Sequence, residues 1–139
     1  MQKTSSETDL LARYLAEERL KGFAWGCDNG DCLLFLLGWA ERAVGRRASV
    51  AWRASYCDEA GARAALSAFG GAPAAVCDVL GPPRIGSKAQ RGDVGLLAFE
   101  DWHLGMICTG NLWAIRDVRR GVRLLRKEAD IVWSTGFVA

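Results

Sequence analysis

The first part of the chain carries apolar residues at the spacing of an amphipathic helix. From Leu11 on, these residues fall on one helical face, and the pattern ends at Gly22. Ser6, with Asp9 three residues later, resembles a capping box. We therefore expect a first helix that begins near Ser6 and packs one face against the rest of the protein.

Two further segments predict helices of different kinds. Residues 31–44 are apolar on nearly all sides and are followed by Gly45, which is typical of a helix buried in the middle of a domain. The alanine-rich segment 58–69 is closed by Gly70 and predicts a third helix. Prolines and glycines between residues 81 and 90 argue against regular structure there, so this stretch separates two halves of the chain.

The second half has the period of strands rather than helices. Short apolar runs bounded by turn residues predict antiparallel strands at 93–99, 103–108, 112–115 and 122–125. Residues 109–111 predict a hairpin turn between the second and third of these strands. Helices followed by a strand meander indicate an α+β fold in which the buried helix packs on a small antiparallel sheet.

Composition limits the function classes more than it selects one. The 139 residues are 50% hydrophobic and 24% charged, which fits one folded domain over residues 1–139. A net charge of +2 gives no reason to expect nucleic-acid binding. The apolar run from Cys32 to Ala40 is too short to cross a bilayer. The N-terminal segment has acidic residues at the positions where a signal peptide would have an apolar stretch. We expect synthesis in the cytoplasm, without a signal peptide, and no membrane insertion.

The cysteines argue for free thiols. Their number is odd, which does not fit a disulfide framework: Cys27, Cys32, Cys57, Cys77 and Cys108. Cys27 and Cys32 are spaced loosely for zinc ligands and no second close pair exists, so we expect no metal site and no cofactor.

Cys32 and His103 form the most informative pair in the sequence. His103 is the single histidine and begins a predicted strand, whereas Cys32 lies at the start of the predicted buried helix. A helix N-terminus favours the thiolate, and a histidine opposite it would act as base and then acid in acyl transfer. A cysteine there can also be a small buried side chain. Asp28 and Asp31 flank the thiol, and we expect them to cap the helix rather than to act on the thiol.

Three segments together resemble the NlpC-type papain-like cysteine peptidases, which cut stem peptides of peptidoglycan. Phe23-Ala24-Trp25-Gly26 followed by Asp31-Cys32 is similar to that family's aromatic-x-Trp-Gly loop and Asp-Cys helix start. Arg91-Gly92-Asp93-Val94 is similar to its Pro-Gly-Asp-Leu entry to the sheet, and the segment 103–107 is similar to its His-Val-Gly-Ile-Tyr strand. The resemblance spans residues 23–115.

The resemblance implies a papain-like fold with Cys32 as nucleophile and His103 as base. It places Trp25, Gly26 and Asp31 at the substrate and oxyanion side of the site. The family's third catalytic residue is a polar group on the strand after the histidine, where this chain has only apolar residues. Asn111, in the preceding turn, is the nearest polar candidate.

Two other departures concern the neighbours of the nucleophile. Leu33 and Leu34 replace the family's Ser-Gly after the cysteine, and Phe23 replaces a tyrosine whose hydroxyl can help to bind the oxyanion. Two hypotheses follow: a cysteine endopeptidase or amidase, and a structural protein of the same fold with a degenerate site.

The small size and the segment from Trp113-Ala114 through Ala129-Asp130-Ile131-Val132-Trp133 resemble compact NlpC-like proteins from phage tail and gene-transfer-agent gene clusters. This likeness implies a tail-tip component with peptidoglycan peptide and tail-tip proteins as partners, and it implies no direct contact with nucleic acid. We interpret the basic residues near the C-terminus as a solvated sheet edge: Arg116, Arg119, Arg120, Arg123, Arg126 and Lys127. We expect the other tryptophans to be core or interface anchors: Trp39, Trp52, Trp102, Trp113 and Trp133.

Overall fold

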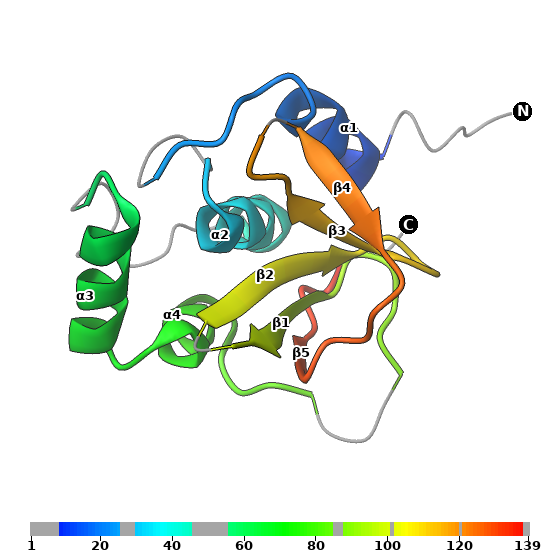
Figure 1. Ribbon diagram of the computed structural model, residues 1–139. Helices are drawn as coiled ribbons and strands as arrows, with labels where there is room; N and C mark the ends of the chain where they lie inside the picture. Colours follow the sequence, from blue (N-terminus) through cyan, green and yellow to red (C-terminus); the bar gives the residue numbers. More distant parts are fainter. Residues whose placement is uncertain are drawn as a thin grey trace, which may run out of the picture.

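The structure is a computed structural model that describes residues 9–25, 30–45, 56–84, 88–100, 102–119 and 121–137. Within these residues the chain forms helices first and strands afterwards, which confirms the predicted α+β class (Figure 1). The helices are α1 (Leu10–Glu18), α2 (Cys32–Val44), α3 (Glu59–Phe69) and α4 (Ala72–Leu80). The strands are β1 (Val94–Phe99), β2 (Trp102–Cys108), β3 (Trp113–Arg116), β4 (Val122–Leu125) and β5 (Ile131–Trp133).

An aspartate fixes the start of three of these helices. The side chains of Asp9, Asp31 and Asp58 each accept a hydrogen bond from the backbone N–H three residues later, at 2.7–2.9 Å. Each cap satisfies an N–H that has no partner within the helix. Asp9 is thus the cap of α1, whereas Ser6, expected in that role, lies outside the described residues.

α4 was not predicted from the sequence. Gly70 ends α3 as expected, but α4 begins directly after Gly71. Pro73 lies in its first turn, where proline is tolerated because the first backbone N–H groups have no helical partner.

The sheet is antiparallel and has the order β4-β3-β2-β1-β5. The four predicted strands and the turn at 109–111 are confirmed, and the N–H of Thr109 donates to the carbonyl of Leu112 at 2.8 Å. The fifth strand, β5, is three residues long and was not predicted. It pairs with β1 on the edge opposite β4, so the chain crosses the sheet after the meander.

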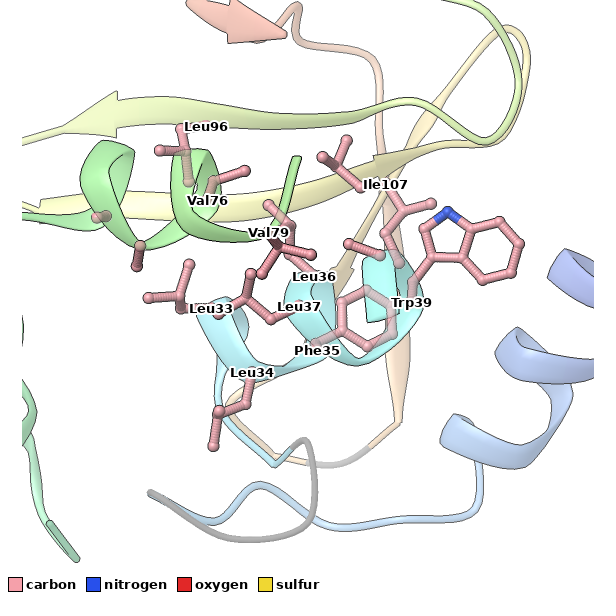
Figure 2. Close-up of a cluster of buried hydrophobic side chains, with 14 of the residues drawn as sticks. Leu33, Leu34, Phe35, Leu36, Leu37, Trp39, Val76, Val79, Leu96 and Ile107 are labelled. Carbon is pink, nitrogen blue, oxygen red and sulfur yellow. The ribbon is translucent and has the colours of Figure 1, made fainter. Parts of the chain in front are cut away.

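The buried helix α2 lies in the centre of the molecule, as its sequence predicted (Figure 1). Every residue from Cys32 to Ala40 is buried, and Figure 2 shows side chains of α4, β1 and β2 next to those of the helix. Gly105 of β2 allows the closest approach, because a Cβ atom there would lie 2.5 Å from the backbone carbonyl oxygen of Cys32. The start of α2 is therefore held directly against β2.

A smaller apolar cluster covers the other face of the sheet. Met106, Cys108 and Trp113 form its centre, and Ala89 and Ala129 from the connecting segments pack on it. The burial of Trp39, Trp113 and Trp133 confirms their predicted role as anchors, whereas Trp52 lies outside the described residues.

Candidate functional site

Cys32 is the first residue of α2 and faces a cavity of about 290 Å³. Its side chain is nearly buried, with 7% of the residue exposed. The thiol donates a hydrogen bond to the backbone carbonyl of His103, with a distance of 3.8 Å from sulfur to oxygen. The backbones of the two residues singled out by the sequence are thus adjacent.

The surroundings of Cys32 favour the protonated thiol. Burial raises its pKa above the ordinary value, and the negative charge of Asp31 raises it further. Hydrogen bonds with the backbone of Gly105 and the side chain of Trp102 act in the opposite direction but do not compensate. These surroundings therefore oppose the thiolate that a position at a helix N-terminus alone would favour.

His103 lines a different hollow from Cys32. The residue is half-buried on β2 and lines a second cavity of about 280 Å³ together with Leu33, Leu66 and Ala72. Across the described part of the chain, no hydrogen bond joins the imidazole of His103 to the Cys32 thiol. The structure brings the strand of His103 to Cys32 but does not form a thiol–imidazole pair.

Asn111 lies apart from both residues. It is exposed in the turn after β2, whereas His103 is near the start of that strand. The five residue steps from His103 to Cys108 already span roughly 17 Å at the usual rise of a strand. Asn111 cannot orient the imidazole across this distance, so its assignment as the third member is not retained.

Asp31 is a buried helix cap, as expected for one of the two flanking acids. One carboxylate oxygen accepts from the N–H of Leu34 at 2.9 Å, and the other accepts from the hydroxyl of Tyr56 at 2.7 Å. Tyr56 was not identified from the sequence, because no local pattern links it to a helix 25 residues earlier. Asp28 lies outside the described residues.

An aromatic wall borders the cavity beside Cys32. Trp25 lines it as predicted, and its ring meets those of Phe23 and Trp102 edge to face at 4.9 and 6.1 Å between centroids. The guanidinium of Arg63 lies 4.6 Å from the centroid of the Trp102 ring, a cation–π arrangement. Gly26, expected at the same site, lies outside the described residues.

The remaining cavity lining comes from α3 and from the β3–β4 hairpin. Arg63 pairs with Glu59 at 3.0 Å across one turn of α3. On the opposite side the lining includes Asp117, which follows β3, and Arg123 on the edge strand β4. The aromatic wall and these charged groups suit a ligand with both apolar and charged parts.

Arg116 does not belong to a solvated edge, contrary to the prediction from the basic cluster. Its side chain is fully buried and forms an ion pair with the equally buried Glu18 of α1. It also donates to the backbone carbonyls of Glu18 and Gly121, at 2.8 and 3.3 Å. Arg123 and Arg126 are exposed as expected, and Arg120 lies outside the described residues.

The other described cysteines do not add to the site. Cys57 is exposed, Cys77 is half-buried and Cys108 is buried in the second apolar cluster, and all three are free thiols. The part of the chain that the structure describes contains no cluster of three or more potential metal ligands. Cys27 lies outside it.

None of the helices described is long and apolar enough to span a membrane.

Comparisons with known proteins place the chain in a family. Searches of curated proteins and of solved structures find no match for this chain. A family defined as a domain of unknown function, DUF6950, matches residues 3–135, and the chain therefore belongs to the DUF6950 family.

Proposed function

We propose that this protein is an NlpC-type papain-like domain that binds a peptidoglycan stem peptide beside Cys32 without cleaving it, as a component of a phage or gene-transfer-agent tail tip. The fold type and the tail-tip setting rest on the sequence motifs. The binding role rests on the cavity, whose aromatic wall and charged lining suit a short peptide.

One observation favours binding over cleavage. The Cys32 thiol donates to the main-chain carbonyl of His103, and within the described residues no hydrogen bond joins it to the imidazole. A cysteine nucleophile needs a base within hydrogen-bond reach or a lowered thiol pKa. Here the pKa of the thiol is raised, and within the described residues no hydrogen bond joins the thiol to the His103 imidazole, so the arrangement lacks both.

The second candidate is a cysteine endopeptidase or amidase on the same fold. It is favoured by the contact between the start of α2 and the strand that carries the chain's single histidine. In this reaction the thiolate of Cys32 attacks the peptide carbonyl, and His103 takes the thiol proton and returns it to the leaving amine. This reaction needs a thiol–imidazole contact in place of the bond from the thiol to the backbone carbonyl of His103.

The pH dependence of Cys32 alkylation separates the two functions. Iodoacetamide labelling is followed by mass spectrometry in the wild type and in His103→Ala, with the exposed Cys57 as a reference in the same digest. Binding without cleavage predicts a Cys32 midpoint above that of Cys57 and no change in His103→Ala. A Cys32 midpoint well below that of Cys57, which shifts when the imidazole is removed, would instead support the peptidase.

A direct assay completes the test. Purified muropeptides are incubated with the wild type and with Cys32→Ala, and stem-peptide binding is measured on both by calorimetry. The proposed function predicts binding by the wild type and no products from either protein. Hydrolysis by the wild type that is abolished in Cys32→Ala would establish the second candidate, and absence of binding would refute the first.

A further inference from the structure

Strand β2 has an open edge next to Cys32. It pairs with β1 at every position from Trp102 to Ile107, but with β3 only at positions 107 and 108. The N–H of Cys108 donates toward the β1 side, to the carbonyl of Asp93. Because directions alternate along an antiparallel strand, the main-chain groups of His103 and Gly105 point toward the open edge.

The Cys32 thiol occupies this edge. It donates to the carbonyl of His103 at 3.8 Å, and the nearby backbone N–H of Gly105 acts to lower the pKa of the thiol. The sulfur of Cys32 thus lies beside the carbonyl of His103 and the N–H of Gly105, which both point toward the open edge. The peptide unit of a neighbouring strand would take the same position. Since sulfur is a weak donor and a weak acceptor, a peptide unit makes stronger bonds to the same two groups.

The cavity beside this edge also has two charges without an ion pair in the described part of the chain. Among its charged lining residues, Glu59 pairs with Arg63, and Arg116 pairs with the buried Glu18. No ion pair within the described residues includes Asp117 or Arg123, both of which line the cavity on the β3–β4 side. A ligand with one ammonium and one carboxylate group would complement both.

We propose that the open edge of β2 binds the main chain of an extended peptide that carries an ammonium and a carboxylate, in place of the Cys32 thiol. The peptide adds to the sheet as a strand segment between β2 and the aromatic wall, a known mode of peptide recognition. Asp117 and Arg123 select its charged groups. This inference rests on the proposed function, because a stem peptide with a diamino acid carries both charges.

The test measures where and how tightly two peptides bind. The ¹⁵N-labelled full chain is titrated with the stem tripeptide L-Ala-γ-D-Glu-meso-diaminopimelate and, separately, with the linear peptide Glu-Ala-Lys. We expect the largest amide shifts at residues 103–105. Cys32→Ala should bind roughly three- to tenfold more tightly, because one competing hydrogen bond is removed, and Cys32→Ser should bind more weakly, because a hydroxyl is a stronger donor.

Charge variants test the selectivity of the same edge. Asp117→Asn and Arg123→Gln should each weaken binding of both peptides, whereas Arg126→Gln, on an exposed residue outside the cavity lining, should not. Dispersed amide spectra of all variants verify their folding.

The outcomes distinguish the inference from the proposed function. Saturation without shifts at residues 103–105, or weaker binding by Cys32→Ala, would overturn the inference. If the stem tripeptide binds with shifts elsewhere, the function stands and the inference fails. If only Glu-Ala-Lys binds at the edge, the inference stands and the stem-peptide function fails. If neither peptide binds, both are refuted.

Discussion

One residue at the start of α2, Asp31, affects both the helix and the neighbouring thiol of Cys32. Asp31 stabilises the helix by capping Leu34, yet its charge is one of the causes that raise the pKa of the thiol. Asp31→Asn should keep the cap, because asparagine is an equally good N-cap, and should remove the charge. We expect the pKa of Cys32 to fall, so that alkylation at a fixed pH below the midpoint becomes faster than in the wild type.

The matched control for this prediction is Asp58→Asn. Asp58 caps α3 through Gly61 in the same way, but it is exposed and is not among the groups that shift the pKa of Cys32. The alkylation midpoint of Cys32 should stay at the wild-type value in this variant. An unchanged midpoint in Asp31→Asn would show that burial alone raises the pKa of the thiol.

At the scale of helices and strands, the contact between α2 and β2 depends on one glycine. A Cβ atom at Gly105 would lie 2.5 Å from the carbonyl oxygen of Cys32, so Gly105→Ala must move the helix away from the strand. We expect a loss of about 1–3 kcal/mol in the free energy of unfolding, measured by urea denaturation. Gly22→Ala, where no atom lies within 4 Å of the added carbon, should change it far less.

α1 is joined to the sheet through a buried ion pair. Arg116→Met removes the buried partner of Glu18 and leaves the fully buried carboxylate with Lys21, which pairs with it at 2.8 Å. Loss of one member of a buried pair typically costs about 3–5 kcal/mol. The double variant Glu18→Gln with Arg116→Met should recover part of this loss in thermal or urea unfolding, because the buried charge is then removed as well. Equal stability of the single and double variants would mean that Glu18 is compensated by other groups, including Lys21.

Elements with strong local signals could be predicted from the sequence, and those made by distant contacts could not. α2 was predicted because its apolar run lies between a capping aspartate and Gly45, which adopts a positive φ of 75°. β5 has only three residues and exists because β1 offers it an edge. The burial of Arg116 depends on Glu18, 98 positions earlier, which no local pattern reveals.

The candidate site shows the same division. The position of Cys32 at a helix start and of His103 on a strand followed from local patterns, and both are found where they were expected. The hydrogen bonds from the Cys32 thiol to the carbonyl of His103 and from Tyr56 to Asp31 depend on packing between separate elements. Sequence reasoning therefore located the backbone of the site but not the chemistry of its side chains.

At the scale of the whole molecule, the turn before β1 joins segments from both ends of the chain. The carbonyl of Gly92 accepts hydrogen bonds from the indole of Trp39 and the hydroxyl of Thr135, both at 2.8 Å. Gly92 has a positive φ of 97°, and a Cβ atom there would lie 2.5 Å from Phe137. The motif that resembles a peptidase signature thus has a structural role here, because it holds α2 and the C-terminal segment against the sheet.

Arg91, in the same turn, joins α1 to this junction through an ion pair with Asp9. Because Asp9 titrates, the stability of the fold depends on pH. Burial acts to raise the pKa of Asp9, but hydrogen bonds from Arg91 and from the N–H of Ala12, with the charge of Arg91, outweigh it and lower the pKa. A lowered pKa in the folded state contributes stability above the unfolded value of about 3.9, and this contribution is lost as the pH falls through the folded value.

Asp9→Asn keeps a capping side chain but removes the charge, so it should lower the free energy of unfolding by about 1 kcal/mol at neutral pH. The difference from the wild type should shrink as the pH falls below about 3.9, because the wild-type carboxylate is then protonated as well. Urea denaturation from pH 7 to pH 2.5 measures both effects. Repeating the comparison in an Arg91→Gln background should diminish the pH dependence; if it persists at full size, the N–H of Ala12 rather than Arg91 holds the carboxylate in its charged form.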